Sequence, residues 1–292
     1  MCSPKVMSVV EMGTARRTFL RSMGAAAVGL GTAAVGLRAE SQSNGSPRVA
    51  TTVHFEKVVD LTHVLEPNVP NYFRLNMAIT PLLTIEQHGV FVNQLTLPEH
   101  YGTHFDTPAH FIRRGTTGES IEPQQLVGPL VIVDIAERAA ADPNAELTVA
   151  DLERWELQNG RIPPGAFVAM YSNWAKRWPT AAYLNEDDTG TYNFPGFGGE
   201  AARFLVEERD IIGIGCDSHS LDVGPSTGYP AHFAVLGAGM IGVENLAGLD
   251  DVLRRTERRN QTGAEGGLPL IVIGGLRTLG GSGSPVRALA LV

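Results

Sequence analysis

The sequence predicts one α/β or α+β domain, and two observations lead to this class. Hydrophobic residues make up 43% of the 292 residues and charged residues 18%, as in an ordinary globular protein with a full core. Short apolar runs typical of buried strands alternate with amphipathic segments typical of helices, and we find neither an internal repeat nor a second compositional region. The predicted domain covers residues 53–292, because the residues before it differ in composition.

The alternation of apolar and polar residues predicts the elements of this domain. We expect strands over 53–61, 79–85, 90–97, 130–135, 167–171, 211–216, 268–273 and 288–292. We expect helices over 149–159, over 198–208 and near 246–256, and a helix or a tight turn around 232. Thr148 and Asp151 have the spacing of a capping box before the 149–159 helix, and Gly160 follows its last residue.

Residues 1–39 have the composition of a twin-arginine export signal. Arg16 and Arg17 precede an uncharged, glycine-rich run over 22–37, which is too short for a membrane span. Residues 40–52 are polar and turn-rich, and we expect them to form a disordered linker. A periplasmic or secreted location follows from this interpretation.

Charge and cysteine content exclude several classes of partner. The chain has a formal net charge of −8 at neutral pH, and the predicted signal is net basic, so the remaining chain is more acidic still. An acidic body argues against nucleic acid and anionic membranes as partners. Only Cys216 lies outside the signal, so we expect no intrachain disulfide there.

The most informative stretch runs from His100 through Gly102, His104 and Asp106 to His110, and it holds three of the chain's 8 histidines. Two imidazoles and a carboxylate at this spacing indicate a metal-ligand set, with His110 beside it as a group that can move protons. A straight strand would separate His100 and His104 by about 13 Å, so we expect the chain to curl at Gly102 as a loop at a strand end. The alternative is a turn whose polar side chains are hydrogen-bonded for structural reasons.

His232 and Glu244 stand at the two ends of an almost wholly apolar run. Burying an imidazole and a carboxylate unpaired would be costly, and metal coordination would satisfy both. It is equally consistent with the spacing that Glu244 caps the following helix and that His232 is a hydrogen-bonded core residue.

Two groups of residues are candidates for contact with a small-molecule substrate. They are Tyr72 and Phe73 in a proline-rich loop, and Asp217, Ser218 and His219 after the predicted strand over 211–216. Loops at strand ends commonly carry binding residues. The alternatives are ordinary aromatic packing for the first group and turn chemistry for the second.

The stretch over 100–110 resembles the signature of the cyclase family of metal-dependent hydrolases, which includes bacterial N-formylkynurenine formamidase and isatin hydrolase. The resemblance continues in Asp-Leu-Thr-His over 60–63, in Asp-Ser-x-Ser-x-Asp over 217–222 and in a closing Gly-Ser-Pro-Val-Arg, so it spans roughly 58–290. It implies a compact α/β domain with a swivelling β/β/α core and a mixed sheet, assembled as a homodimer or a tetramer.

The resemblance also implies roles for single residues. Five candidates match the family's metal ligands: His100, His104 and Asp106 for the main ion, and His232 and Glu244 for a second ion in some members. His110 matches the general acid/base, and the ions are Zn²⁺ or Mn²⁺, one or two per site. The chain departs from the family at Thr107, where Ala is usual, and at His219, where a non-basic residue is common.

We therefore predict a hydrolase that cleaves the C–N or C–O bond of a small amide, formamide, cyclic amide or lactone. Metal-activated water would attack the carbonyl, and His110 would transfer protons. Two alternatives stay open. One is a lyase or dehydratase that uses the same ion to stabilise an enolate, and the other is a periplasmic metal-binding protein without catalysis.

Overall fold

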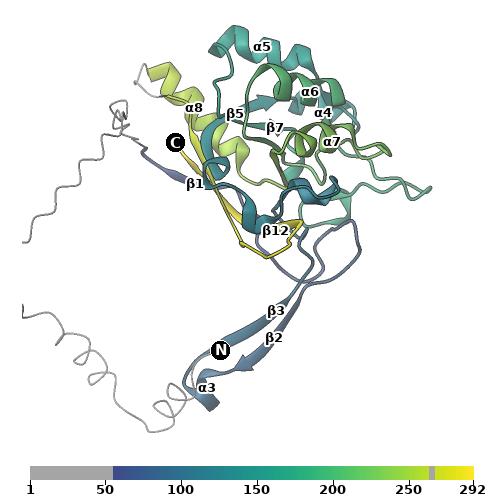
Figure 1. The fold of residues 1–292 in the computed structure, drawn as a ribbon, viewed down its shortest axis with the longest axis vertical. Helices are drawn as coiled ribbons and strands as arrows, with labels where there is room; N and C mark the ends of the chain where they lie inside the picture. Colours follow the sequence, from purple (N-terminus) through teal and green to yellow (C-terminus); the bar gives the residue numbers. More distant parts are fainter. Residues whose placement is uncertain (1–54, 263–266) are drawn as a thin grey trace, which may run out of the picture. The chain divides into compact units, whose positions relative to one another are not determined.

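The structure is a computed structural model that describes residues 55–262 and 267–292 (Figure 1). The predicted export signal and linker, and the first residues of the strand expected over 53–61, lie outside these ranges. The chain separates into two compact units. One comprises His54–Ala78 and Leu95–Val292 and is called the main unit below. The other comprises Met1–Val53 and Ile79–Gln94, of which only the second segment is described.

Within the described residues, the main unit is built on an 8-stranded mixed sheet in the order β1-β12-β11-β5-β7-β9-β10-β4. Its strands are β1 (Val58–Asp60), β4 (His104–Asp106), β5 (Val127–Asp134), β7 (Phe167–Tyr171), β9 (Gly213–Cys216), β10 (Ile241–Glu244), β11 (Leu270–Gly275) and β12 (Gly283–Leu291). The neighbours β5, β7, β9 and β10 run parallel, whereas the remaining pairs are antiparallel. Because β4 pairs with β12 as well as with β10, the sheet closes on itself like a barrel.

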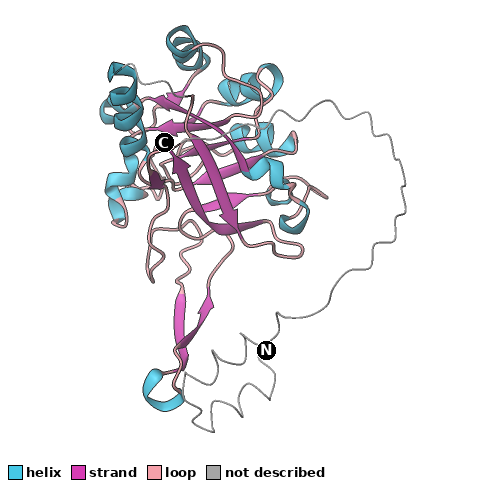
Figure 2. Cartoon of the chain, turned by 90° about the vertical axis from the view of Figure 1, so that its left-hand side faces the viewer, coloured by secondary structure: helices cyan, strands magenta, loops and turns pink. Residues whose placement is uncertain are grey.

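Helices surround this sheet (Figure 2). The α-helices of the main unit are α4 (Ala136–Ala141), α5 (Val149–Asn159), α6 (Gly199–Glu208), α7 (Pro230–Gly237) and α8 (Leu249–Thr262). Short 3-10 helices occupy Pro108–His110, Gly118–Ser120, Pro123–Leu126, Trp174–Arg177 and Ala181–Tyr183. Among the described residues, no helix combines the length and the apolar character needed to cross a membrane.

The sequence located most of these elements correctly. Helix α5 has the predicted bounds, and its capping box is formed by the Thr148 and Asp151 side chains. The predicted α/β class with a mixed sheet is confirmed, and so are the helices α6, α7 and α8. Helix α4 was not predicted; it begins where the Asp134 carboxylate accepts a hydrogen bond from the Ala136 N–H.

The prediction that the His100 stretch is only a loop was wrong in one part. The chain does curl at Gly102, whose φ is +65°, and Thr107 is extended before Pro108, as is usual for a residue that precedes proline. However, His104–Asp106 form the strand β4. A three-residue strand is too short to show a period of two, and its partners β10 and β12 are distant in sequence.

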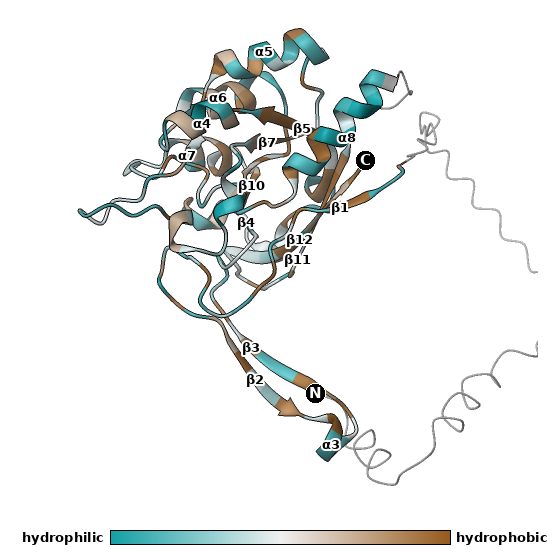
Figure 3. Cartoon of the chain, turned by 180° about the vertical axis from the view of Figure 1, so that it is seen from behind, coloured by the Kyte–Doolittle hydropathy of each residue, from teal (hydrophilic) through white to brown (hydrophobic). Residues whose placement is uncertain are grey.

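The two faces of the sheet pack into separate hydrophobic clusters. Along β7, Val168 and Met170 join the cluster that includes helices α5 and α6, while Phe167 and Ala169 join the cluster that includes Val252 of α8. Figure 3 shows that polarity follows burial: the buried β5 is coloured mainly hydrophobic, and the partly exposed α8 is coloured mainly hydrophilic. Both faces of the parallel strands are therefore buried, as is typical of a parallel sheet covered on both sides.

The strands β2 (Ala78–Leu83) and β3 (Val92–Thr96) pair to form a hairpin, and the four-residue helix α3 (Ile85–His88) lies between them in the sequence. The two predicted strands are confirmed, but the connection between them is longer than the sequence suggested, because α3 begins at Ile85, which was assigned to the first strand. A second small pairing joins β6 (Glu146–Leu147) and β8 (Gly196–Phe197) in the main unit.

Candidate metal-binding and catalytic site

Two paired strands place three of the predicted ligands side by side. His104 and Asp106 are two residues apart on β4, so their side chains leave the same face of the strand. Glu244, at the end of β10, is the register partner of His104. Helix α7 supplies His232, which is buried with the other three side chains. Residues far apart in the sequence thus meet because β4 closes the sheet against β10.

The four side chains surround one point. The His104 Nε2 atom lies 3.4 Å from Asp106 Oδ1 and 3.3 Å from Glu244 Oε2. The His232 Nε2 atom lies 3.4 Å from Asp106 Oδ2 and 3.1 Å from Glu244 Oε1. Two imidazole nitrogens and two carboxylates in this arrangement form a donor set for a divalent metal ion.

The backs of both imidazoles are held by acceptors. His104 Nδ1 lies 2.9 Å from the Gly102 carbonyl, so Nδ1 carries the hydrogen and Nε2 keeps a lone pair. His232 Nδ1 lies 2.6 Å from Asp222 Oδ2, which orients that ring in the same way. Such second contacts fix the tautomer and direction of metal-binding histidines.

Unpaired buried atoms test whether this donor set fits an ion. Among the described residues, His104 Nε2 and Asp106 Oδ2 are buried without a hydrogen-bond partner. A buried polar atom without a partner costs about 1–3 kcal/mol. Both atoms point to the place that the four side chains surround, so a metal ion there would satisfy both of them.

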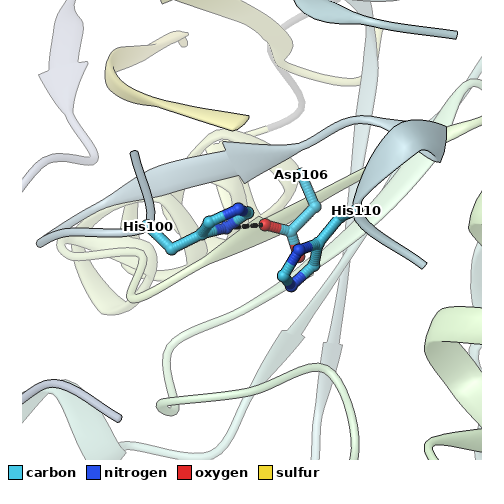
Figure 4. Close-up of side chains that lie close together, drawn as sticks. All are labelled: His100, Asp106 and His110. Carbon is cyan, nitrogen blue, oxygen red and sulfur yellow. Dashed lines mark hydrogen bonds and ion pairs between the residues drawn. The ribbon is translucent and has the colours of Figure 1, made fainter. Parts of the chain in front are cut away.

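His100 and His110 adjoin this cluster (Figure 4). His100 Nδ1 lies 2.7 Å from Asp106 Oδ1, and one donor atom from each of His100, Asp106 and His110 falls within 4.8 Å of the others. The His110 ring stacks on His100 with ring centroids 3.9 Å apart. No side-chain hydrogen bond of His110 is present among the described residues, so this imidazole is available for proton exchange.

The buried charges shift the pKa values of the whole cluster. Burial opposes the charged form of His104, but the nearby Asp106 and Glu244 carboxylates outweigh it and raise its pKa to about 10. Burial likewise opposes the charge of Glu244, yet its histidine neighbours lower its pKa to about 2, and that of Asp106 falls well below its usual value. The two carboxylates therefore draw positive charge to this point, as imidazolium protons or as a metal ion.

The pKa of His110 moves in the opposite direction. Burial lowers it below the ordinary value of 6.5, and the nearby Asp106 charge only partly offsets this effect. A histidine with a lowered pKa is neutral at pH 7 and can accept a proton. The structure thus distinguishes His110 from His104 and His232, whose pKa values are raised.

The cluster opens into a cavity of about 230 Å³. Its wall is formed by Tyr72, Phe73, His100, His104, His110, Phe111, His219, Ser220, Tyr229, His232 and Glu244. The Tyr72 and Tyr229 hydroxyls lie 3.0 Å apart, and the Tyr72 ring is stacked over His219. Burial lowers the pKa of His219 to about 4, so its imidazole is neutral at pH 7.

The predicted substrate contacts divide into two groups. Tyr72, Phe73 and His219 lie on the cavity wall. The Asp217 carboxylate instead accepts hydrogen bonds from Ser172 and from the Trp174 N–H, and burial raises its pKa to about 6. The Ser218 hydroxyl donates to the Ser220 carbonyl. Asp217 and Ser218 thus hold the loops behind the cavity.

Sequence reasoning did not identify Phe111, Ser220 and Tyr229 as cavity residues, or Asp222 as the partner of His232. Asp222 did carry a signal, because it belongs to the polar cluster after the strand β9. No local pattern marks Tyr229, which reaches the cavity from the residue before α7.

Comparisons with known proteins agree with this geometry. The Cyclase family model matches residues 59–223. Isatin hydrolase of Roseibium aggregatum is 34% identical over 256 residues, which cover 81% of this chain and 92% of that protein. Kynurenine formamidase of Salinibacter ruber is 26% identical over 209 residues, which cover 70% of this chain and 81% of that protein. Among solved structures, isatin hydrolase A from Labrenzia aggregata bound to benzyl benzoate has a TM-score of 0.71 and 33% identity, covering 81% of this chain and 93% of that one.

Proposed function

We infer that this chain, which belongs to the cyclase family, opens the ring of a small cyclic amide such as isatin. Similarity to an isatin hydrolase and to a kynurenine formamidase, together with the donor set of the site, supports metal-dependent hydrolysis of an amide bond. The cyclic amide is the finer proposal. It is favoured over a linear formamide because the similarity to isatin hydrolase is higher and covers more of both chains than the similarity to kynurenine formamidase.

The observation that carries this proposal is the convergence of imidazole nitrogens and carboxylates at the cavity floor. We assign the metal ligands to five residues: His100, His104, Asp106, His232 and Glu244. One or two ions of Zn²⁺ or Mn²⁺ suit these ligands. When bound by these ligands, a divalent ion would lower the pKa of a water molecule and polarise a substrate carbonyl.

His110 is the proposed general acid/base. Its ring lies against His100, and burial keeps it neutral. It can therefore take a proton from the attacking water and return a proton to the amide nitrogen as the C–N bond breaks. The ring of a cyclic amide opens in this step to an amine and a carboxylate.

The cavity wall suits a small planar ring. Tyr72, Phe73, Phe111 and Tyr229 contribute aromatic side chains around the metal-ligand cluster. His219 adds a neutral imidazole, which can donate a hydrogen bond to a carbonyl oxygen but carries no charge to attract a carboxylate. We propose that these residues select an uncharged aromatic substrate.

A panel assay with isotopically labelled water tests the reaction. The protein is reconstituted with Mn²⁺ or Zn²⁺ and incubated with isatin, an aryl formamide and a lactone. We expect turnover of isatin, with one solvent oxygen in the product. Turnover without solvent oxygen would establish the lyase alternative, and metal binding without turnover of any substrate would establish the non-catalytic one.

We also propose that the protein is exported. The twin-arginine pair, Arg16 and Arg17, supports this location. Replacing both arginines by lysine should keep the protein inside the cell, as measured by fractionation. Secretion of the substituted protein at the wild-type level would overturn the proposal.

The exposed apolar side chains of the hairpin support a homo-oligomer. Ile79, Leu82 and Phe91 are 42%, 53% and 63% exposed. An isolated two-stranded ribbon is only marginally stable in water, and clustered exposed apolar residues mark interaction surfaces. We propose that a second copy of this chain covers them.

A further inference from the structure

His100 differs from the other histidines of the cluster in the nitrogen that it turns toward the site. Its Nδ1 faces Asp106 Oδ1, whereas its Nε2 lies 3.0 Å from the Ser282 hydroxyl. The Ser282 hydroxyl in turn donates to Glu99 Oε2 at 2.7 Å, and the Ser282 N–H donates to the same oxygen at 3.1 Å. A continuous series of close polar contacts therefore joins Asp106 to Glu99.

We propose that Glu99 and Ser282 are positioning residues that fix the tautomer of His100, so that His100 binds the metal ion through Nδ1. This inference rests on the proposed metal site but not on any particular substrate. It assigns His100 the opposite nitrogen from His104 and His232, which offer Nε2.

The direction of each hydrogen bond follows from the number of hydrogens available. An ionised carboxylate only accepts, so the single hydroxyl hydrogen of Ser282 points to Glu99. The Ser282 oxygen can then only accept from His100, which places the ring hydrogen on Nε2. Nδ1 is left with a lone pair.

That lone pair faces the Asp106 carboxylate at 2.7 Å. Two acceptors at this distance repel each other unless a cation lies between or beside them. His100 Nδ1 and Asp106 Oδ1 are thus set as a pair of ligands by Glu99 and Ser282. His104 and His232 are set by the Gly102 carbonyl and by Asp222, so each histidine has its own acceptor behind it.

Glu99 and Ser282 can be changed without altering the surface that a substrate would meet. Neither is among the residues that line the 230 Å³ cavity. Glu99 is half-buried on the wall of a different, apolar cavity of about 590 Å³, beside Leu97 and Pro98. Their side chains reach the cluster through His100, whose Nε2 lies 3.0 Å from the Ser282 hydroxyl.

The test measures Mn²⁺ affinity by calorimetry in the full-length protein. The variants are Ser282→Ala, which removes the hydroxyl, and Ser282→Thr, which keeps it. We expect Ser282→Ala to weaken Mn²⁺ binding about 10- to 100-fold, as is typical for loss of an outer partner of a ligand. Ser282→Thr should bind Mn²⁺ within about threefold of wild type. Threonine, unlike alanine, has a hydroxyl that can accept the hydrogen bond from His100.

Glu119→Gln is the matched control. The Glu119 carboxylate also accepts a backbone N–H from the same loop, that of Gly280, but it has no link to His100. We expect this variant to bind Mn²⁺ like wild type. Equal losses of affinity in Glu119→Gln and Ser282→Ala would overturn the proposal, because the effect would then come from loop folding.

A second readout does not depend on the metal. Nitrogen NMR of the histidine-labelled, metal-free protein reports which ring nitrogen carries hydrogen. We expect the Nε2–H form for His100 in wild type and a shift of that signal in Ser282→Ala. Wild-type affinity in Ser282→Ala, or an Nδ1–H form of His100 in wild type, would overturn the proposal. Absence of amide hydrolysis would overturn only the proposed function, since Mn²⁺ binding is measured separately.

Discussion

Asp222 offers the sharpest test of how the metal ligands are oriented. Its Oδ2 lies 2.6 Å from His232 Nδ1, and its Oδ1 accepts the Ala231 N–H at 2.8 Å, at the start of α7. In Asp222→Asn, one oxygen can still accept from Ala231, but an amide N–H then faces His232. The His232 hydrogen is thereby displaced to Nε2, where it blocks the lone pair needed for the metal.

The expected size of this effect follows from the buried, charge-assisted hydrogen bond that is lost. Such a bond contributes about 1.5–3 kcal/mol, and a tenfold change in affinity corresponds to about 1.4 kcal/mol. We therefore expect Asp222→Asn to weaken Mn²⁺ binding about 10- to 100-fold, measured by calorimetry.

Asp151→Asn serves as the control for this prediction. Asp151 is also a buried carboxylate at a helix start, where it completes the α5 capping box, but it does not contact the metal site. This variant should lower the unfolding temperature and leave Mn²⁺ affinity unchanged. Wild-type metal affinity in Asp222→Asn would refute the role of Asp222.

Three further predictions concern proton transfer, ligation and assembly. His110→Ala should retain metal by elemental analysis and lose about 10²–10⁴-fold in turnover, whereas His104→Ala should lose both; an active His110→Ala protein would contradict the general acid/base role. Because burial lowers the pKa of His110, the basic form should persist below pH 6.5; kcat/KM should fall only as the pH drops through that lowered value, and a fall beginning above pH 7 would argue against His110. Phe91→Glu should convert the oligomer to monomer by light scattering; an unchanged mass would exclude the hairpin as the interface.

Local signals explain what could be predicted from sequence. The α5 helix is bounded by its own capping box and by Gly160, so its limits are determined within the segment. The ligand motif is contiguous from His100 to His110, and its curl depends on Gly102 itself. The combination of residue type and spacing was sufficient to indicate a metal site with a neighbouring proton carrier.

The tertiary structure resolved the alternatives that the sequence spacing left open for His232 and Glu244. His232 and Glu244 were equally consistent with structural roles until β10 paired with β4 and brought Glu244 opposite His104. The strand β4 itself, and with it the closure of the sheet, depends on partners that are distant along the chain.

The sequence by itself therefore determined that this protein has an α/β fold and carries a motif of three histidines and one aspartate that indicates a metal site. Only the tertiary structure decided which nitrogen each histidine presents. The reason is physical: a ring tautomer is set by the acceptor behind it, and for His100 that acceptor is Ser282, 182 residues away in sequence.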